Sequence, residues 1–144
     1  MEPFAVTLTP VLTVRDAAAA VAFYARAFGA AEVHRSTAPD GRIVAELEVG
    51  AARLRVAAEA PSAGNLGPAA LGGTSVRLNL LVPDPDAVVA RAVAGGASEV
   101  APVADQAFGL RQGRIADPFG HHWLIGRPLD GPAGDWARKK LRRS

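Results

Sequence analysis

The chain has 144 residues, of which 49% are hydrophobic and 21% charged, enough apolar material for one compact domain or two small modules sharing a core. It contains no cysteine, which excludes disulfides, thiolate chemistry and cysteine-based zinc sites. The formal net charge of +2 comes from the C-terminus, since residues 1–127 hold eleven Lys or Arg and twelve Asp or Glu, a net of −1. A balanced body with a basic tail does not predict a nucleic-acid groove.

The first half of the chain reads as a strand, a helix and three more strands. A short apolar strand is predicted at residues 11–14, and Asp16 then has the side chain that caps a helix N-terminus. An Ala-rich amphipathic helix follows and ends at Gly29, where a left-handed residue is favourable. Turn signals at residues 39–41 and 49–50 delimit the later strands. We assign residues 1–58 to this first βαβββ module.

Residues 59–74 are rich in Gly, Pro, Ala and Ser and separate the two halves. This composition is typical of a linker between modules, while a long loop inside a compact domain is often a functional flap. Both interpretations stay open at this point.

The second half repeats the first. A strand in LNLLV leads to Asp84 and Pro85, which suit the cap and the first position of a helix that ends at Gly95. Asp84 lies 84 − 16 = 68 residues after Asp16, as a duplication of one module would place it. Residues 75–128 form this second module, and residues 129–144 form a basic tail that we expect to be solvated.

Two tandem modules of this kind, with TPVLTVRD opening the first and ADPFGHHW closing the second, resemble the vicinal oxygen chelate superfamily, which includes glyoxalases, dioxygenases and bleomycin-resistance proteins. The segments Leu71–Thr74 (LGGT) and Asp117–His121 (DPFGH) are similar to motifs of its PhnB-like group. The resemblance implies an α+β fold of cupped mixed sheets with helices outside, built into a homodimer. It implies little about function, because one fold hosts many chemistries.

In metal-using relatives, four positions on the concave strands supply the ligands. Carried over to this sequence, they fall on Thr9, Leu54, Arg77 and Leu124. None offers the carboxylate or imidazole that a divalent metal requires, so we predict no metal and no other cofactor.

Strand alternation predicts which side chains line the remaining cleft. If Arg77 and Leu124 face inward, His122 and Asn79 do so as well, while Arg53 and Arg55 face outward. Arg77 needs an anionic partner, which is either the ligand or one of Glu46 and Glu48. The predicted ligand-binding residues, including two at the mouth of the cleft in the 103–113 loop, are Thr9, Val11, Thr13, Leu54, Val56, Arg77, Asn79, Phe108, Arg111, His122 and Leu124.

Three functions fit this cleft. The first is a metal-free protein that binds and sequesters a small, flat organic molecule, as bleomycin-resistance relatives do. The second is a metal-independent isomerase or lyase in which His122, the candidate catalytic residue, moves a proton and Arg77 stabilises an enolate. The third is a metal enzyme that uses His121 and His122 with Glu46 or Glu48. Whether the protein is an enzyme stays open.

The chain has no apolar run near the ~20 residues of a membrane span, and its N-terminus lacks the pattern of a signal peptide. We therefore expect a cytoplasmic protein whose partners are a small molecule and a second copy of itself, with no nucleic acid and no membrane.

Overall fold

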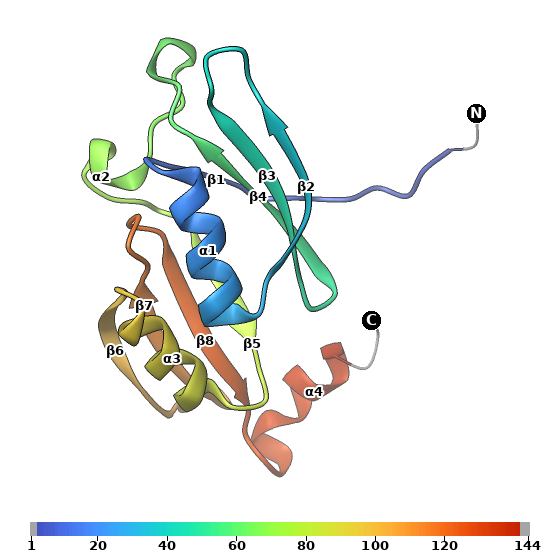
Figure 1. The fold of residues 1–144 in the computed structure, drawn as a ribbon. Coiled ribbons are helices and arrows are strands. Elements are labelled where there is room, and N and C mark those ends of the chain that lie inside the picture. Colours follow the sequence, from blue (N-terminus) through green and yellow to red (C-terminus); the bar gives the residue numbers. More distant parts are fainter. Residues whose placement is uncertain (1–2, 142–144) are drawn as a thin grey trace.

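The computed structural model describes residues 3–141, which form two four-stranded mixed sheets with helices packed between and beside them (Figure 1). The first sheet, in the order β1-β4-β3-β2, consists of β1 (Val11–Val14), β2 (Ala31–Thr37), β3 (Ile43–Val49) and β4 (Ala52–Ala58), and α1 (Ala17–Phe28) follows β1. The second, in the order β5-β8-β7-β6, consists of β5 (Arg77–Leu81), β6 (Ser98–Asp105), β7 (Leu110–Ala116) and β8 (His122–Pro128), and α3 (Pro85–Ala94) follows β5. The tandem βαβββ fold of the α+β class is confirmed.

Both long helices begin at the predicted caps. Asp16 Oδ1 accepts a hydrogen bond from the Ala19 amide at 3.0 Å, and Asp84 Oδ1 accepts one from the Ala87 amide at 3.1 Å. Gly29 has the predicted left-handed conformation, with φ of 69°. The second helix ends at Gly95 as predicted, but the left-handed conformation expected there is wrong: the φ of Gly95 is −87°, and a positive φ of 114° occurs one residue later, at Gly96.

The two modules share one core. Helices α1 and α3 lie side by side in Figure 1, and the aromatic side chains of α1 reach across to the second sheet. The Phe28 and Trp123 rings have centroids 4.5 Å apart, and Tyr24 lies 5.4 Å from the same Trp ring. Buried aromatic pairs of this kind stabilise a fold beyond the area they bury.

The buried carboxylate of Asp117 lies at the centre of this junction. Its Oδ2 accepts hydrogen bonds from the Tyr24 hydroxyl and, at 2.9 Å, from Trp123 Nε1. Its Oδ1 accepts from the backbone amides of Phe119 and His121, at 2.9 and 3.0 Å. Burial, followed by the charge of Asp117, raises the pKa of the Tyr24 hydroxyl well above its ordinary value, so Tyr24 always donates. The DPFGHH segment is therefore a structural link between the modules.

The 59–74 segment is folded. A short 3₁₀ turn, η1 (Pro61–Ala63), is followed by α2 (Pro68–Leu71), and the Gly67 amide donates to Glu59 Oε1 at 3.3 Å. Pro68 is buried against Gly120, where an added Cβ would come within 2.8 Å of the proline ring. The segment thus packs on the Asp117 turn, and Gly120 (φ 92°) has both a conformational and a steric reason to be glycine.

The C-terminal prediction needs correction. Residues Asp135–Leu141 form a helix, α4, held against the end of β8 by hydrogen bonds from Arg138 to the Leu129 and Gly131 carbonyls and from Trp136 Nε1 to the Phe108 carbonyl. The tail thus packs on the body of the protein through α4. The last basic residues, Arg142 and Arg143, lie outside the described residues.

At the other end of the described chain, residues 3–8 extend away from the body as an arm (Figure 1). Phe4, Val6 and Leu8 alternate along this arm and are 88%, 98% and 95% exposed. None of the helices within residues 3–141 has both the length and the apolar character that crossing a membrane requires.

Candidate functional site

Each sheet buries one face against the helices and leaves the other face open. In β1 the buried side chains are Leu12 and Val14, so Val11 and Thr13 point to the open face as predicted. Thr9 is half-buried just before this strand. Since Val11 pairs with Arg55 and strand partners share a face, Arg55 lies on the open face too.

This register overturns the prediction for β4. Leu54 and Val56 are 5% and 0% exposed and belong to the core, whereas Arg53 and Arg55 occupy the open face. A slip of one residue exchanges the two faces of a strand. The prediction carried ligand positions over by counting from the turn at Gly50, and the structure shows that this count is one residue out in the first module.

The charged side chains of this open face pair with one another. Arg53 contacts Glu46 at 2.8 Å and Glu48 at 3.4 Å, and Arg55 contacts Glu46 at 3.2 Å. Hydrogen bonds from Arg53 and then Arg55 lower the pKa of Glu46, which stays ionised. Exposed pairs such as these add little stability, but they leave neither glutamate available to Arg77.

The open face of the second sheet, which we call the cationic face, carries a different set of side chains. Arg77 on β5 pairs in register with His122 on β8, and Asn79 pairs with Leu124. On β7, Arg114 is the partner of Leu124, and its Nε donates to His122 Nδ1 at 3.0 Å. Arg77, Asn79, Arg114, His122 and Leu124 therefore lie together across three adjacent strands.

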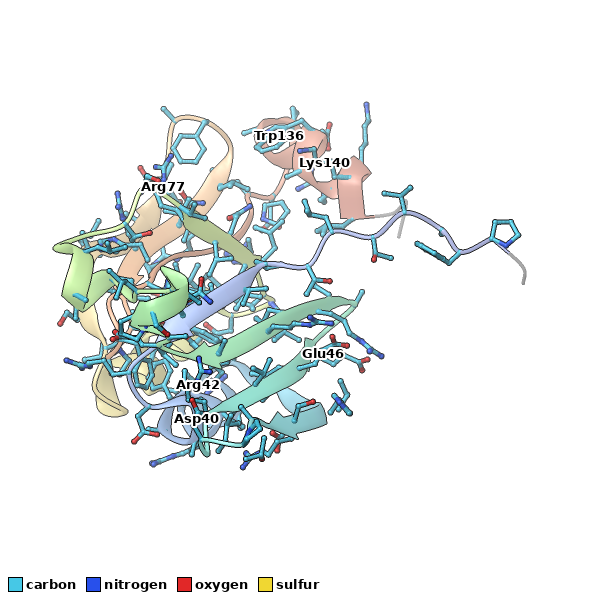
Figure 2. The ribbon with its side chains drawn as sticks, turned by 90° about the horizontal axis from the view of Figure 1, so that it is seen from above. Asp40, Arg42, Glu46, Arg77, Trp136 and Lys140 are labelled. Atoms are coloured by element: carbon cyan, nitrogen blue, oxygen red, sulfur yellow. The ribbon has the colours of Figure 1, made fainter. Side chains whose placement is uncertain are left out.

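Arg77 has no hydrogen-bonding or ionic partner among residues 3–141. Figure 2 shows Arg77 and Glu46 on different sheets and well apart. Neither Glu46 nor Glu48, the carboxylates that the sequence offered as partners, contacts Arg77, because both pair with Arg53 or Arg55 instead. The guanidinium of Arg77 remains open to an external anion.

His122 lies in a setting that favours its neutral form. Partial burial, and next the positive charge of Arg114, lower the pKa of its imidazole below the ordinary value. The neighbouring His121 has a structural role instead, since its Nε2 lies 2.8 Å from the Thr13 carbonyl and links the two modules.

The two residues predicted at the cleft mouth lie elsewhere. Arg111 points to the helix side, where it contacts Asp86 of α3 at 2.9 Å and Asp105 at 3.1 Å, so its charge is already neutralised. Phe108 is 55% exposed, but it lies beside α4, at the end of β7 and β8 opposite to His122. Seven residues of β7 separate these ends by ~20 Å, so neither side chain belongs to the cationic face.

Two grooves run between the sheets. One, of about 640 Å³, is bordered by Thr9, Leu54 and Asn79, by the apolar side chains of Leu78 and Trp123, and by the charged side chains of Glu46, Arg53 and Arg55. The other, of about 750 Å³, lies between β1 and the start of β5, and α2 forms its wall. Three predicted binding residues, Thr9, Leu54 and Asn79, thus border the groove of about 640 Å³, although Leu54 belongs to the core side of β4.

A family model described as the glyoxalase/bleomycin resistance protein/dioxygenase superfamily matches residues 6–125. The chain belongs to this superfamily. An uncharacterized protein of Mycobacterium tuberculosis is 41% identical over 126 residues, which cover 85% of this chain and 74% of that protein.

Solved structures share the glyoxalase-superfamily fold. TioX from Micromonospora sp. ML1 is 30% identical, with 85% of this chain and 100% of that chain covered and a TM-score of 0.65. A gene product of Arabidopsis thaliana is 28% identical, with 86% and 100% covered and a TM-score of 0.69. The fosfomycin resistance protein FosX of Listeria monocytogenes, at 14% identity, 89% and 97% coverage and a TM-score of 0.69, shows the fold alone.

The residues at the superfamily's metal positions do not fit a divalent cation. By strand register, the equivalent of Leu124 in the first module is Arg55, so the four positions hold Thr9, Arg55, Arg77 and Leu124. Two guanidinium groups would repel a cation, and the alkyl side chain offers no donor. No group of three or more His, Asp or Glu side chains placed to hold a metal occurs within residues 3–141.

Sequence reasoning missed Arg114. Its signal was present, because Arg114 and His122 stand on neighbouring strands joined by the short Asp117 turn, and alternation in that hairpin places them on one face. Sequence reasoning also missed that the carboxylate of Asp117 accepts hydrogen bonds inside the core. Its partner Tyr24 lies 93 residues earlier, and such a distant contact produces no local sequence pattern.

Proposed function

We propose that this protein binds a small, flat and apolar organic molecule with an anionic or polar edge, in a cleft completed by a second copy of the chain. The ligand is sequestered without a metal, as in the bleomycin-resistance branch of the superfamily. The observation that carries the proposal is Arg77, which has no partner within residues 3–141 and lies beside His122 and Asn79. Asn79 in turn borders a groove that combines apolar side chains such as Leu78 and Trp123 with the charged Glu46, Arg53 and Arg55. A cleft with apolar walls and a few convergent polar groups is the usual form of a small-molecule site.

The LGGT and DPFGH segments support a place in the PhnB-like group, and a cytoplasmic location remains a prediction of the sequence.

The two enzymatic alternatives have less support. An isomerase or lyase needs His122 as a proton acceptor, but Arg114 occupies the lone pair of its Nδ1. A metal enzyme needs His122 near Glu46 or Glu48, and these glutamates lie on the other sheet in pairs with Arg53 and Arg55.

A thermal-shift screen tests the binding function. Aromatic acids, amides and phenols are added to the full chain, and the chlorides of zinc, manganese and nickel form a parallel arm. A ligand at 100 times its Kd should stabilise the fold by ~2.7 kcal/mol. We expect aromatic compounds to raise the melting temperature and the metal ions to leave it unchanged. Stabilisation by a metal ion alone would refute the metal-free proposal.

The dimer is supported by unpaired strand edges and exposed apolar groups. β1 and β5 are edge strands of their sheets, and Val11 and Val76 near these edges are 54% and 62% exposed. Exposed edges with apolar side chains need cover, and the arm that holds Val6 and Leu8 could supply part of it from a second copy.

Light scattering at micromolar concentration should therefore give twice the mass of one chain. The double variant Val6→Asp/Leu8→Asp should shift the protein toward the monomer, whereas Val93→Asp, on the outer side of α3, should not. A monomeric mass for the unaltered protein would contradict the proposed dimer.

A further inference from the structure

Our inference rests on the proposed function and concerns how the cationic face recognises its ligand. His122 is the central residue of this face, with Arg77 as its register partner on β5 and Arg114 bonded to it from β7. Three nitrogen-bearing side chains thus stand side by side on three adjacent strands, and none of them has a carboxylate partner among residues 3–141.

The hydrogen bond between Arg114 and His122 fixes where the imidazole proton is. An arginine Nε–H can only donate, so His122 Nδ1 must accept and cannot carry a proton. A neutral imidazole then has its single proton on Nε2. The same bond leaves His122 with no acceptor for a second partner, so its remaining nitrogen acts as a donor.

Partial burial and then the charge of Arg114 favour this neutral form. Arg114 and Arg77 face it from the two neighbouring strands, and His121 precedes it in the chain. The carboxylate of Asp117 also acts on His122 and opposes these effects, but its oxygens are already engaged by Tyr24, Trp123 and two backbone amides. If His122 Nδ1 were protonated, its N–H would face the Nε–H of Arg114, and the hydrogen bond between the two side chains would be lost.

We propose that Arg114 holds His122 as an Nε2–H donor, and that this donor, together with Arg77 and the terminal guanidinium nitrogens of Arg114, binds a carboxylate on the ligand. Two planar guanidinium groups suit an anion with two oxygens in one plane, and a neutral histidine donor adds direction without a need for a further counter-charge. The preferred ligands are therefore aromatic carboxylic acids, and Arg114 is a positioning residue for His122.

The proton position is tested first, by long-range ¹H–¹⁵N correlation spectra of the full chain across pH 4.5–9. Unaltered protein should show His122 as the Nε2–H tautomer, with a pKa below the ordinary range. In Arg114→Leu the tautomers should mix and the pKa should rise. Arg114→Gln, whose amide can still donate to Nδ1 without a charge, should partly restore the Nε2–H form. An Nδ1–H tautomer in the unaltered protein overturns the proposal, and this spectrum decides even if Arg114→Leu fails to fold.

Acid recognition is tested with 2-naphthoate and 2-naphthamide, which differ only in the charged edge. Calorimetric titration should show the acid bound at least about tenfold more tightly, as expected for a charge-assisted contact. That preference should fall below about threefold in Arg77→Leu and in Arg114→Leu, and should persist in the matched control Arg91→Leu on α3. Equal binding of the two compounds, or no binding of either, refutes the carboxylate receptor. Binding of neutral aromatic compounds in the thermal-shift screen would leave the proposed function intact.

Discussion

Replacing Asp117 by Ala should destabilise the folded protein by about 3–5 kcal/mol, because the change leaves several buried hydrogen-bond donors without an acceptor. The hydroxyl of Tyr24, the indole N–H of Trp123 and the amides of Phe119 and His121 would all lose their acceptor. Asp117→Asn should also be costly despite its similar shape, because the amide NH₂ must face either the two side-chain donors or the two backbone donors. Urea denaturation monitored by tryptophan fluorescence measures both effects.

Two variants provide the scale for this measurement. Asp84→Ala removes the cap of α3, an exposed single hydrogen bond, and should cost only about 1 kcal/mol. Tyr24→Phe removes one donor and leaves the carboxylate with three, so its cost should lie near that of a single hydrogen bond, again about 1 kcal/mol. A loss for Asp117→Ala no larger than for Asp84→Ala would show that the buried network does not hold the modules together.

Changing Arg77 to Leu should weaken ligand binding by about 2 kcal/mol, roughly thirtyfold in Kd, while the unliganded protein keeps its stability within about 0.5 kcal/mol. The reason is that Arg77 has no partner within residues 3–141, so its charge contributes only when a ligand anion is present. Melting curves recorded with and without a ligand from the screen separate the two effects.

The matched control is again Arg91→Leu, which removes an exposed arginine from the helix side. It should change neither binding nor stability. A loss of stability in unliganded Arg77→Leu would mean that the guanidinium has a partner in the assembled protein, for example Glu46 or Glu48 of a second copy, and would remove the argument for ligand binding.

The fold was predictable because its signals are local. Each helix cap is set by a single carboxylate, Asp16 or Asp84, and the 68-residue offset between them reveals the duplication. The shared face of Arg77, Asn79, His122 and Leu124 also followed from simple alternation, since β8 is anchored by a recognisable turn.

The candidate site was only half predictable. In β4, apolar and charged residues alternate strictly, so Leu54 shares a face with Val56 and Arg53 shares a face with Arg55. The pattern does not show which of the two faces is buried, because charged residues can also line a cleft. Counting from a turn decided the question wrongly. The contact of Arg111 with Asp86 was likewise invisible, because it joins residues 25 apart whose proximity depends on how α3 lies on its sheet.

The link between Tyr24 and Asp117 makes the two halves of the repeat unequal. At the 68-residue offset of the helices, which the strand register also gives for β3 and β7, the counterpart of Tyr24 is Ala92 and the counterpart of Asp117 is Val49. Both counterparts are buried and apolar, so the second junction is filled by hydrocarbon where the first has a charge. A chain made of two first halves would bury tyrosine hydroxyls without an acceptor, and a chain of two second halves would bury carboxylates without the tyrosine. The two halves are therefore complementary across this junction and are not interchangeable.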